Sequence, residues 1–298
     1  MRAAVLAGML LLAPCTGLAG ESAAQAESRQ VLVDKVAADF DSPYLLRIVY
    51  DGDYSEFLKE ESSHIRENFR HEEFWRAEYS HIMPEEVVKK VPFEEFSRQV
   101  LQDKDARATL EELIYENDIK RVKKALEEAA AITIWNAGLK DKSEIFVSGG
   151  AFEGLMWFTE YGKVSYGTED VIKEVVRHEL YHAEQNAKGL PTMDGRRITP
   201  DERMRMDPTL NDLLDELCAH IRTFEYFREK GEDAPELASI QRLLAYFDMV
   251  APEIKGLAGT LGDRDRMRMD WELGEYEDAE ASMHTEYGRI AKKLAKPE

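Results

Sequence analysis

The sequence predicts a mainly α protein of the α+β class, in which a small β-hairpin or sheet packs beside one central helix. Apolar residues recur at spacings of three and four over most of the chain, the period of an amphipathic helix. Convincing β-type runs occur only between Glu144 and Tyr166. Hydrophobic residues make up 44% of the chain and aromatic residues 9%, which is enough apolar material for a core.

The first 26 residues are predicted to be a secretory signal peptide. Arg2 precedes the apolar run 3–13, and small residues end at Ala24-Gln25-Ala26, which fits a cleavage site. A buried N-terminal helix is the alternative. No stretch approaches the roughly 20 apolar residues that a membrane span requires. We therefore expect an exported protein, periplasmic or secreted, with no integral membrane segment after removal of the signal.

Two cysteines occur, Cys15 and Cys218, and the first lies inside the predicted signal. The mature chain would then hold one thiol and no internal disulfide. The segment Leu12-Ala13-Pro14-Cys15 faintly resembles a lipoprotein signal, in which the cysteine carries the lipid. The proline directly before the cysteine departs from that pattern. We expect a cleaved signal rather than a lipid anchor.

Residues 27–140 are predicted to form a helical N-terminal region. Leu110, Leu113 and Ile114 illustrate its helical spacing, and the apolar segment 129–135 is read as its last turn. No motif of obvious chemical meaning occurs in it. Prolines divide it into several helices, at Pro43, Pro84 and Pro92.

Residues 141–231 differ in pattern and are predicted to form the functional core. A strand is expected at 144–147, and the runs 155–158 and 163–166 around Gly162 predict a hairpin. A helix follows, with Thr168 as its cap and Gly189 at its end.

A second long helix is predicted to begin with Asp207 as its cap and Pro208 at its first position, and to end at Gly231. Residues 232–298 are predicted to form a C-terminal helical region, with helices over about 235–250 and 271–294.

The charge of the chain excludes some partners. It holds 39 Lys and Arg against 59 Asp and Glu, a net charge of −20, and no basic patch stands out. Such a balance repels the phosphates of nucleic acids and anionic lipid headgroups. It attracts divalent cations and basic peptides, so if the substrate is a peptide or protein we expect a modest preference for cationic ones.

The segment His178-Glu179-Leu180-Tyr181-His182 fits the pattern H-E-x-x-H in the middle of the first of these helices. Residues four apart lie one above the other on a helix, so both imidazoles can bind one metal ion. Glu179 would project beside the metal and take a proton from a water that the metal activates. Two ordinary histidines on a half-buried helix are the alternative.

A catalytic zinc ion needs a third protein ligand and an open position. Asp212, Asp215, Glu216 and His220 lie on the second long helix. Glu216 is the preferred candidate, because it borders the buried stripe and the small residues after it let two helices approach closely. His220 is an alternative ligand, a partner behind a ligand or a donor to the developing oxyanion. Tyrosines could also serve as that donor, among them Tyr161, Tyr166 and Tyr226.

Residues 175–185 together with Glu216 resemble the zincin metallopeptidases, specifically the gluzincin branch. The resemblance covers roughly residues 144–230. It implies that His178, His182 and Glu216 bind zinc and that Glu179 is the catalytic base. It also implies that one arm of the hairpin pairs with an extended substrate, although packing under the helix is an equal alternative.

The leading hypothesis is therefore an exported zinc metallopeptidase, a hydrolase of peptide bonds. The rival is a helical periplasmic interaction or scaffold protein whose zinc site is structural or degenerate. A metallohydrolase of non-peptide substrates is a third possibility. An open fourth coordination position beside Glu179 would favour an enzyme, and a fourth side-chain ligand such as His220 a structural site.

Overall fold

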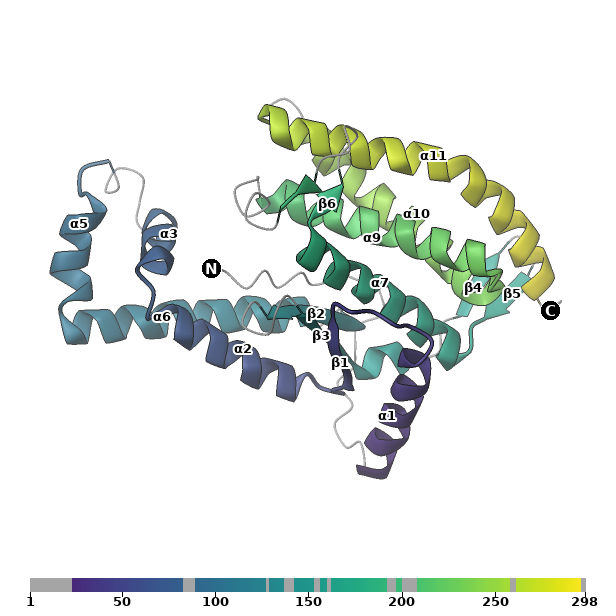
Figure 1. Ribbon diagram of the computed structural model, residues 1–298, viewed down its shortest axis with the longest axis horizontal. Helices are drawn as coiled ribbons and strands as arrows, with labels where there is room; N and C mark the ends of the chain where they lie inside the picture. The colour runs from purple at the N-terminus through teal and green to yellow at the C-terminus, as the bar shows by residue number, and fades with distance from the viewer. Residues whose placement is uncertain are drawn as a thin grey trace. The chain divides into compact units, whose positions relative to one another are not determined.

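In the computed structural model the described residues form two compact units, one from those between 54 and 126 and the other from those of 23–53 and 129–295. The predicted signal peptide lies outside the described residues up to position 22, and residues 23–26 belong to α1 (Ala23–Ala37). The structure describes residues 23–82, 89–126, 129–136, 142–152, 156–159, 162–191, 197–199, 208–257 and 261–295 (Figure 1).

The unit of residues 54–127 is helical where it is described, as the sequence predicts. Phe69 stacks on Trp75 with a ring-centroid distance of 5.7 Å and meets Phe74 edge-on at 5.4 Å. Ile65 and Ile114 close this small apolar core. Its elements are α2 (Ser55–Asn68), α3 (Glu72–Ile82), α5 (Phe93–Phe96), a π-helical segment (Ser97–Leu101) and α6 (Lys104–Leu126).

A three-stranded sheet lies at the base of the other unit. It consists of β1 (Leu45–Tyr50), β2 (Ala131–Asn136) and β3 (Lys142–Val147) in the order β1-β3-β2. β1 runs parallel to β3 and β2 antiparallel to it, and both Tyr50 and Ala131 pair with Val147.

The two outer strands correct the expectation that residues 27–140 are helical throughout. The end of that region, predicted as a helical turn, is the strand β2. Its residues Ala131 to Ile134 are all buried, and the segment 129–135 is apolar except for Thr133, so it lacks the regular alternation that marks a half-buried strand. A run of this length, buried on both sides, has the same periodicity as a buried piece of helix.

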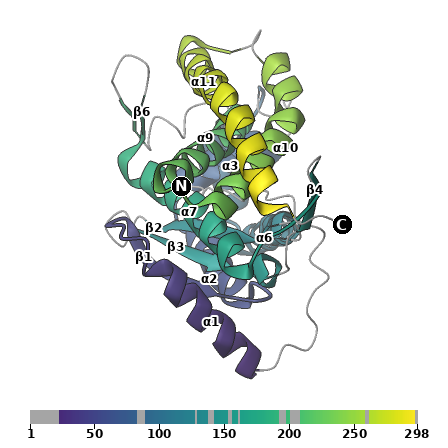
Figure 2. The same ribbon diagram turned by 90° about the vertical axis from the view of Figure 1, so that its right-hand side faces the viewer.

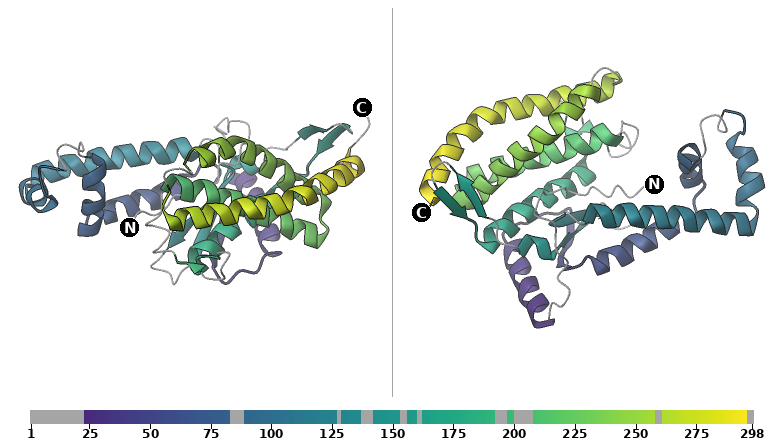
Figure 3. Two further views of the ribbon diagram at one scale, coloured as in Figure 1. Left: turned by 90° about the horizontal axis from the view of Figure 1, so that it is seen from above. Right: turned by 180° about the vertical axis from the view of Figure 1, so that it is seen from behind.

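The predicted hairpin is confirmed by β4 (Met156–Thr159) and β5 (Gly162–Ser165), which pair antiparallel. It forms a sheet of its own. The strand predicted at 144–147 is β3, which joins β1 and β2 and not the hairpin. The hairpin lies beside the C-terminal end of α11 (Asp263–Leu294), as the view from behind shows (Figure 3).

Four long helices are layered over the three-stranded sheet. α7 (Thr168–Lys188) packs directly on β2 and β3, α9 (Pro208–Lys230) packs on α7, and α10 (Asp233–Leu257) and α11 cover α9 (Figure 2). The mainly α architecture is thus confirmed. Among the described residues, none of the helices combines the length and the apolar character needed to cross a bilayer.

Two apolar cores hold these layers together. One lies between the sheet and α7 and includes Ile145, Val147 and Val175. The other lies among α9, α10 and α11 and includes Leu217 and Met283. Because α7 and α9 each contribute to a different core, their facing sides are free to carry polar side chains.

The start of α7 differs slightly from expectation. Thr168 is the first helical residue and Gly167 is the cap. The carboxylate of Asp170 accepts a hydrogen bond from the backbone N–H of Gly167, reaching back as an N3 residue does in a capping box. Asp170 therefore satisfies a backbone donor that would otherwise be free at the helix end.

Gly189 ends α7 with φ 73° and ψ 179°, a backbone conformation that is essentially restricted to glycine. A Cβ at this position would lie 2.3 Å from the carbonyl oxygen of Ile198 in β7 (Arg197–Ile198), which pairs with β6 (Leu190–Pro191). Replacing Gly189 with alanine is expected to destabilise the fold by about 1–3 kcal/mol from the backbone conformation alone, and by more through the clash.

Urea unfolding of the G189A variant measures this loss. Gly274, in the middle of α11, is a matched control, because its added Cβ would meet no atom within 4 Å. We expect Gly274→Ala to stabilise the protein by about 0.5–1 kcal/mol. Equal effects of the two substitutions would contradict the role given to Gly189.

Candidate metal centre

The two histidines of the H-E-x-x-H segment project from one face of α7. Both side chains are fully buried, and their rings meet edge-on with a centroid distance of 4.9 Å. The Nε2 atom of His178 lies 3.2 Å from the Nε2 atom of His182. Their separation of four residues on the helix produces this convergence, as the sequence predicts.

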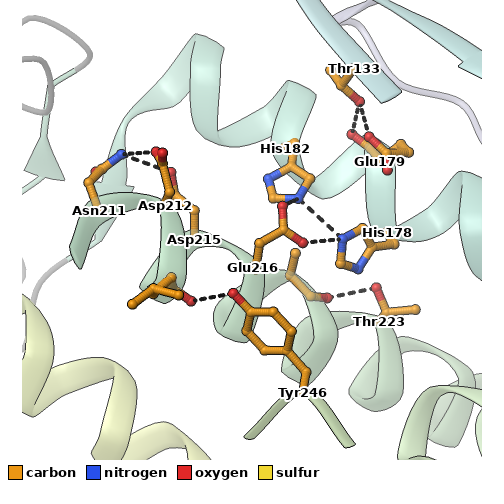
Figure 4. Close-up of polar contacts among 12 residues, drawn as sticks. Thr133, His178, Glu179, His182, Asn211, Asp212, Asp215, Glu216, Thr223 and Tyr246 are labelled. Carbon is orange, nitrogen blue, oxygen red and sulfur yellow. Dashed lines mark hydrogen bonds and ion pairs between the residues drawn. The ribbon is translucent and has the colours of Figure 1, made fainter. Parts of the chain in front are cut away.

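Glu216 reaches the two imidazoles from α9. Its Oε2 atom lies 3.1 Å from His178 Nε2 and its Oε1 atom 3.2 Å from His182 Nε2 (Figure 4). Cys218 and Ala219, which follow it, are fully buried against α7 beside Tyr181. Their small size lets the two helices approach closely enough for a carboxylate to span the gap, which is the reason the sequence favoured Glu216.

The three side chains fit a tetrahedral zinc ion. Zinc binds histidine nitrogen and carboxylate oxygen at about 2.0–2.2 Å, and tetrahedral angles then place its donor atoms about 3.3 Å apart. The two Nε2 atoms lie 3.2 Å apart, and Glu216 approaches them through different oxygens, with Oε2 at 3.1 Å from His178 and Oε1 at 3.2 Å from His182. Among the described residues these three form the one His/Cys/Asp/Glu group whose ligand atoms lie close enough together to hold a metal ion.

The charges in the site also suit a cation. Burial lowers the pKa of His178, although the Glu216 carboxylate works against this effect. Burial by itself would raise the pKa of Glu216, but His182 and His178 outweigh it and hold that pKa below its usual range. Neutral imidazole and ionised carboxylate are the forms that bind metal.

Glu179 is held by the sheet. Its carboxylate faces Thr133 of β2, while the two imidazoles face Glu216 (Figure 4). The Thr133 hydroxyl donates to Glu179 Oε2 at 2.6 Å and lies 3.0 Å from the Glu179 carbonyl oxygen. The other carboxylate oxygen, Oε1, is buried with no hydrogen-bond partner among the described residues. Burial raises the pKa of this carboxyl to about 7.

His220 lies at the centre but outside the ligand set. Its ring centroid is 4.4 Å from that of His178 and 5.2 Å from that of Tyr246, and the side chain is buried. Of the three roles considered for His220, its position fits that of a partner behind the ligand His178. Tyr246 of α10 in turn donates a hydrogen bond to the Leu213 carbonyl at 3.2 Å.

Tyr226 does not reach the centre. It lies ten residues beyond Glu216, or about 15 Å along the axis of α9. Its ring packs against Phe40 at 5.8 Å and under the guanidinium of Arg177 at 4.8 Å. The role of oxyanion donor considered for it is wrong, because ten residues of helix separate it from Glu216, a distance that the sequence separation already implied.

The other candidate acids on α9 also point elsewhere. Asp215 is fully buried and bonded to Arg268 of α11, and Asp212 is exposed. Tyr161 lies outside the described residues, and the hydroxyl of Tyr166 donates to Gln241. The selection of Glu216 over its neighbours thus agrees with the geometry.

Sequence reasoning missed Thr133 and Tyr246. Thr133 was read as part of a helical turn, so nothing placed it opposite Glu179. Tyr246 lies in a helix that was expected to have no part in the site. Neither residue belongs to a local motif, and only the packing of β2 and α10 on α7 and α9 brings them there.

Comparisons of the chain with models of known protein families, with curated proteins and with solved structures give no match. The chemistry of the site therefore has to be argued from the residues and their geometry.

Proposed function

We propose that the protein is an exported zinc-dependent metallopeptidase that hydrolyses peptide bonds in peptide or protein substrates. The observation that supports this most is the convergence of two histidine nitrogens and the two oxygens of one carboxylate, which could together hold a metal ion. A site with three protein ligands leaves one position for water or substrate, which is the pattern of catalytic zinc.

His178, His182 and Glu216 would hold the ion, which when bound supplies a Lewis acid that makes water nucleophilic near neutral pH. Glu179 accepts the proton that the attacking water loses and returns it to the leaving amine nitrogen. Thr133 holds one oxygen of this carboxylate, and the unbonded Oε1 is available for the proton.

Metal removal tests the proposal. The purified chain is expected to contain one zinc per molecule and to cleave a disordered protein such as casein. Dialysis against a zinc chelator should abolish cleavage, and one equivalent of zinc should restore it. A chain that binds no zinc, or one whose cleavage persists without metal, would contradict the proposal.

Replacing Thr133 with valine is expected to lower kcat by about tenfold, because Glu179 loses the bond that orients it. That bond also favours the ionised carboxylate, so its loss raises the pKa of Glu179 further. The activity loss should then be larger at pH 6 than at pH 9, with the acid limb of the kcat profile moved to higher pH.

Thr223→Val is the matched control for this experiment. Thr223 is also buried, but its hydroxyl donates at 2.7 Å to the Ala219 carbonyl of its own helix. We expect this variant to keep its activity and pH profile. A uniform loss at every pH in the T133V variant would show that Thr133 acts on folding alone.

A second function, a helical scaffold with a structural metal site, is favoured by one feature of the same centre. His178, Glu179 and His182 have no exposed surface, and the Glu179 carboxylate faces Thr133 and not the ligands. A structural ion would give one zinc per chain and a large loss of thermal stability on chelation, with no cleavage of any peptide in a random library.

A further inference from the structure

An ion pair lies buried one helical turn from the metal centre. The Nε atom of Arg242 in α10 lies 3.1 Å from the Oε2 atom of Glu174 in α7, and this ion pair lacks the geometry of a hydrogen bond. The side chain of Glu174 is 0% exposed and that of Arg242 is 9% exposed. Both Nη1 and Nη2 of the guanidinium are buried without a hydrogen-bond partner in the part of the chain that the structure describes.

Two helix faces bring this pair to the centre. Glu174 lies four residues before His178 on α7, so the two side chains are neighbours on one face. Arg242 lies four residues before Tyr246 on α10, and the Tyr246 ring faces His220, which contacts His178. Arg242 on α10, paired with Glu174 on α7, therefore lies near the ligand His178.

A buried guanidinium with free N–H groups is chemically incomplete. Buried polar groups in folded proteins are nearly always hydrogen-bonded, and an unmade bond to a charged group is costly. The contact with Glu174 is at the Nε atom of Arg242, and it leaves both Nη atoms without a hydrogen-bond partner among the described residues. The two Nη atoms form the planar fork that binds a carboxylate through two parallel hydrogen bonds, a geometry that lysine does not offer.

We propose that Arg242 binds a carboxylate of the substrate beside the peptide bond to be cleaved. The carboxylate is either the C-terminus of the peptide or the side chain of an acidic residue. This inference rests on the proposed peptidase function, since it names the substrate class of that site. It also reverses the expectation from the net charge of −20: the whole chain attracts cations, but the group next to the centre selects an anion.

Binding to the metal-free chain tests the proposal, because a carboxylate probe would otherwise coordinate zinc. Calorimetric titrations compare N-acetyl-trialanine with its C-terminal amide, and an acetylated Ala-Glu-Ala amide with its Ala-Gln-Ala counterpart. We expect at least one carboxylate to bind about tenfold more tightly than its amide. The pair that shows the preference identifies the source of the carboxylate.

Three variants separate the guanidinium from the ion pair. Arg242→Gln should remove the preference, and Glu174→Gln should keep it. The double variant, Glu174→Gln with Arg242→Gln, replaces the pair with two neutral amides and should fold without the preference even where the single Arg242→Gln chain does not. Arg76→Gln is the control for net charge, because Arg76 is half-exposed in the other unit and pairs with Glu72.

The outcomes distinguish this inference from the proposed function. The role of Arg242 would be overturned if each carboxylate peptide bound the unsubstituted chain no more tightly than its amide does. This holds even if zinc binding and cleavage are found. A preference that survives in the double variant would overturn it as well. A carboxylate preference that Arg242→Gln or the double variant removes would support it, and this readout does not depend on metal or on hydrolysis.

Discussion

Replacing Glu179 with glutamine is expected to lower peptide hydrolysis by a factor of about 10²–10⁴ while leaving one zinc per chain. Glutamine keeps the size of the side chain and can still accept a hydrogen bond from the Thr133 hydroxyl. It cannot take up a proton at neutral pH. The fold and the three ligands should therefore persist, and only the proton transfer should fail. Steady-state kinetics together with zinc analysis of the same preparation measure both quantities.

Glu184→Gln is the matched control. Glu184 lies on the same helix, is about one-third exposed and has its nearest cation, Arg177, at 3.5 Å. The substitution removes one carboxylate from α7 just as Glu179→Gln does, and we expect unchanged kinetics. Full activity of the Glu179→Gln chain would exclude Glu179 as the base. Loss of zinc from it would mean that Glu179 supports the ligands.

Replacing His182 with alanine is expected to remove the metal from the purified chain. Two donors would remain, and the site would lose one of the atoms that now converge at 3.1–3.2 Å. Zinc content after dialysis should fall from one equivalent to near zero. Added zinc at 100 times its dissociation constant should stabilise the natural chain against urea by about 2.7 kcal/mol but leave the variant unchanged.

His284→Ala provides the comparison. His284 lies on α11 with its side chain 68% exposed, and its nearest carboxylate, that of Glu280, is 3.9 Å away. Its removal should change neither zinc content nor stability. One equivalent of zinc in the His182→Ala chain would show that the metal is bound at another site.

Much of the site could be predicted because its signals are local. The spacing of His178 and His182 needs only the pitch of a helix. The bounds of α9 follow from Pro208 at its start and Gly231, in a left-handed conformation with φ 69°, after its end. Glu216 was preferred for its position beside small residues, and the structure brings it to the two histidines.

The parts that could not be predicted depend on contacts between distant segments. The sequence of β2 resembles a helical turn because the segment 129–135 is apolar except for Thr133 and lacks regular alternation, so its pairing with β3 had no local signal. Thr133 and Glu179 are 46 residues apart, and Arg242 and Glu174 are further still. A single sequence contains no measure of such distances, which only the packing of the layers sets.

The pairing of β1 and β2 with the same strand makes residues 54–127 an insertion into one sheet. Tyr50 and Ala131 both pair with Val147, so the chain leaves and re-enters the sheet at the same level, two strand spacings or about 10 Å apart. Joining such close ends has a small entropic cost that grows slowly with the length between them. The inserted helices can therefore lengthen, shorten or change in sequence without altering the strand that positions Thr133 against Glu179.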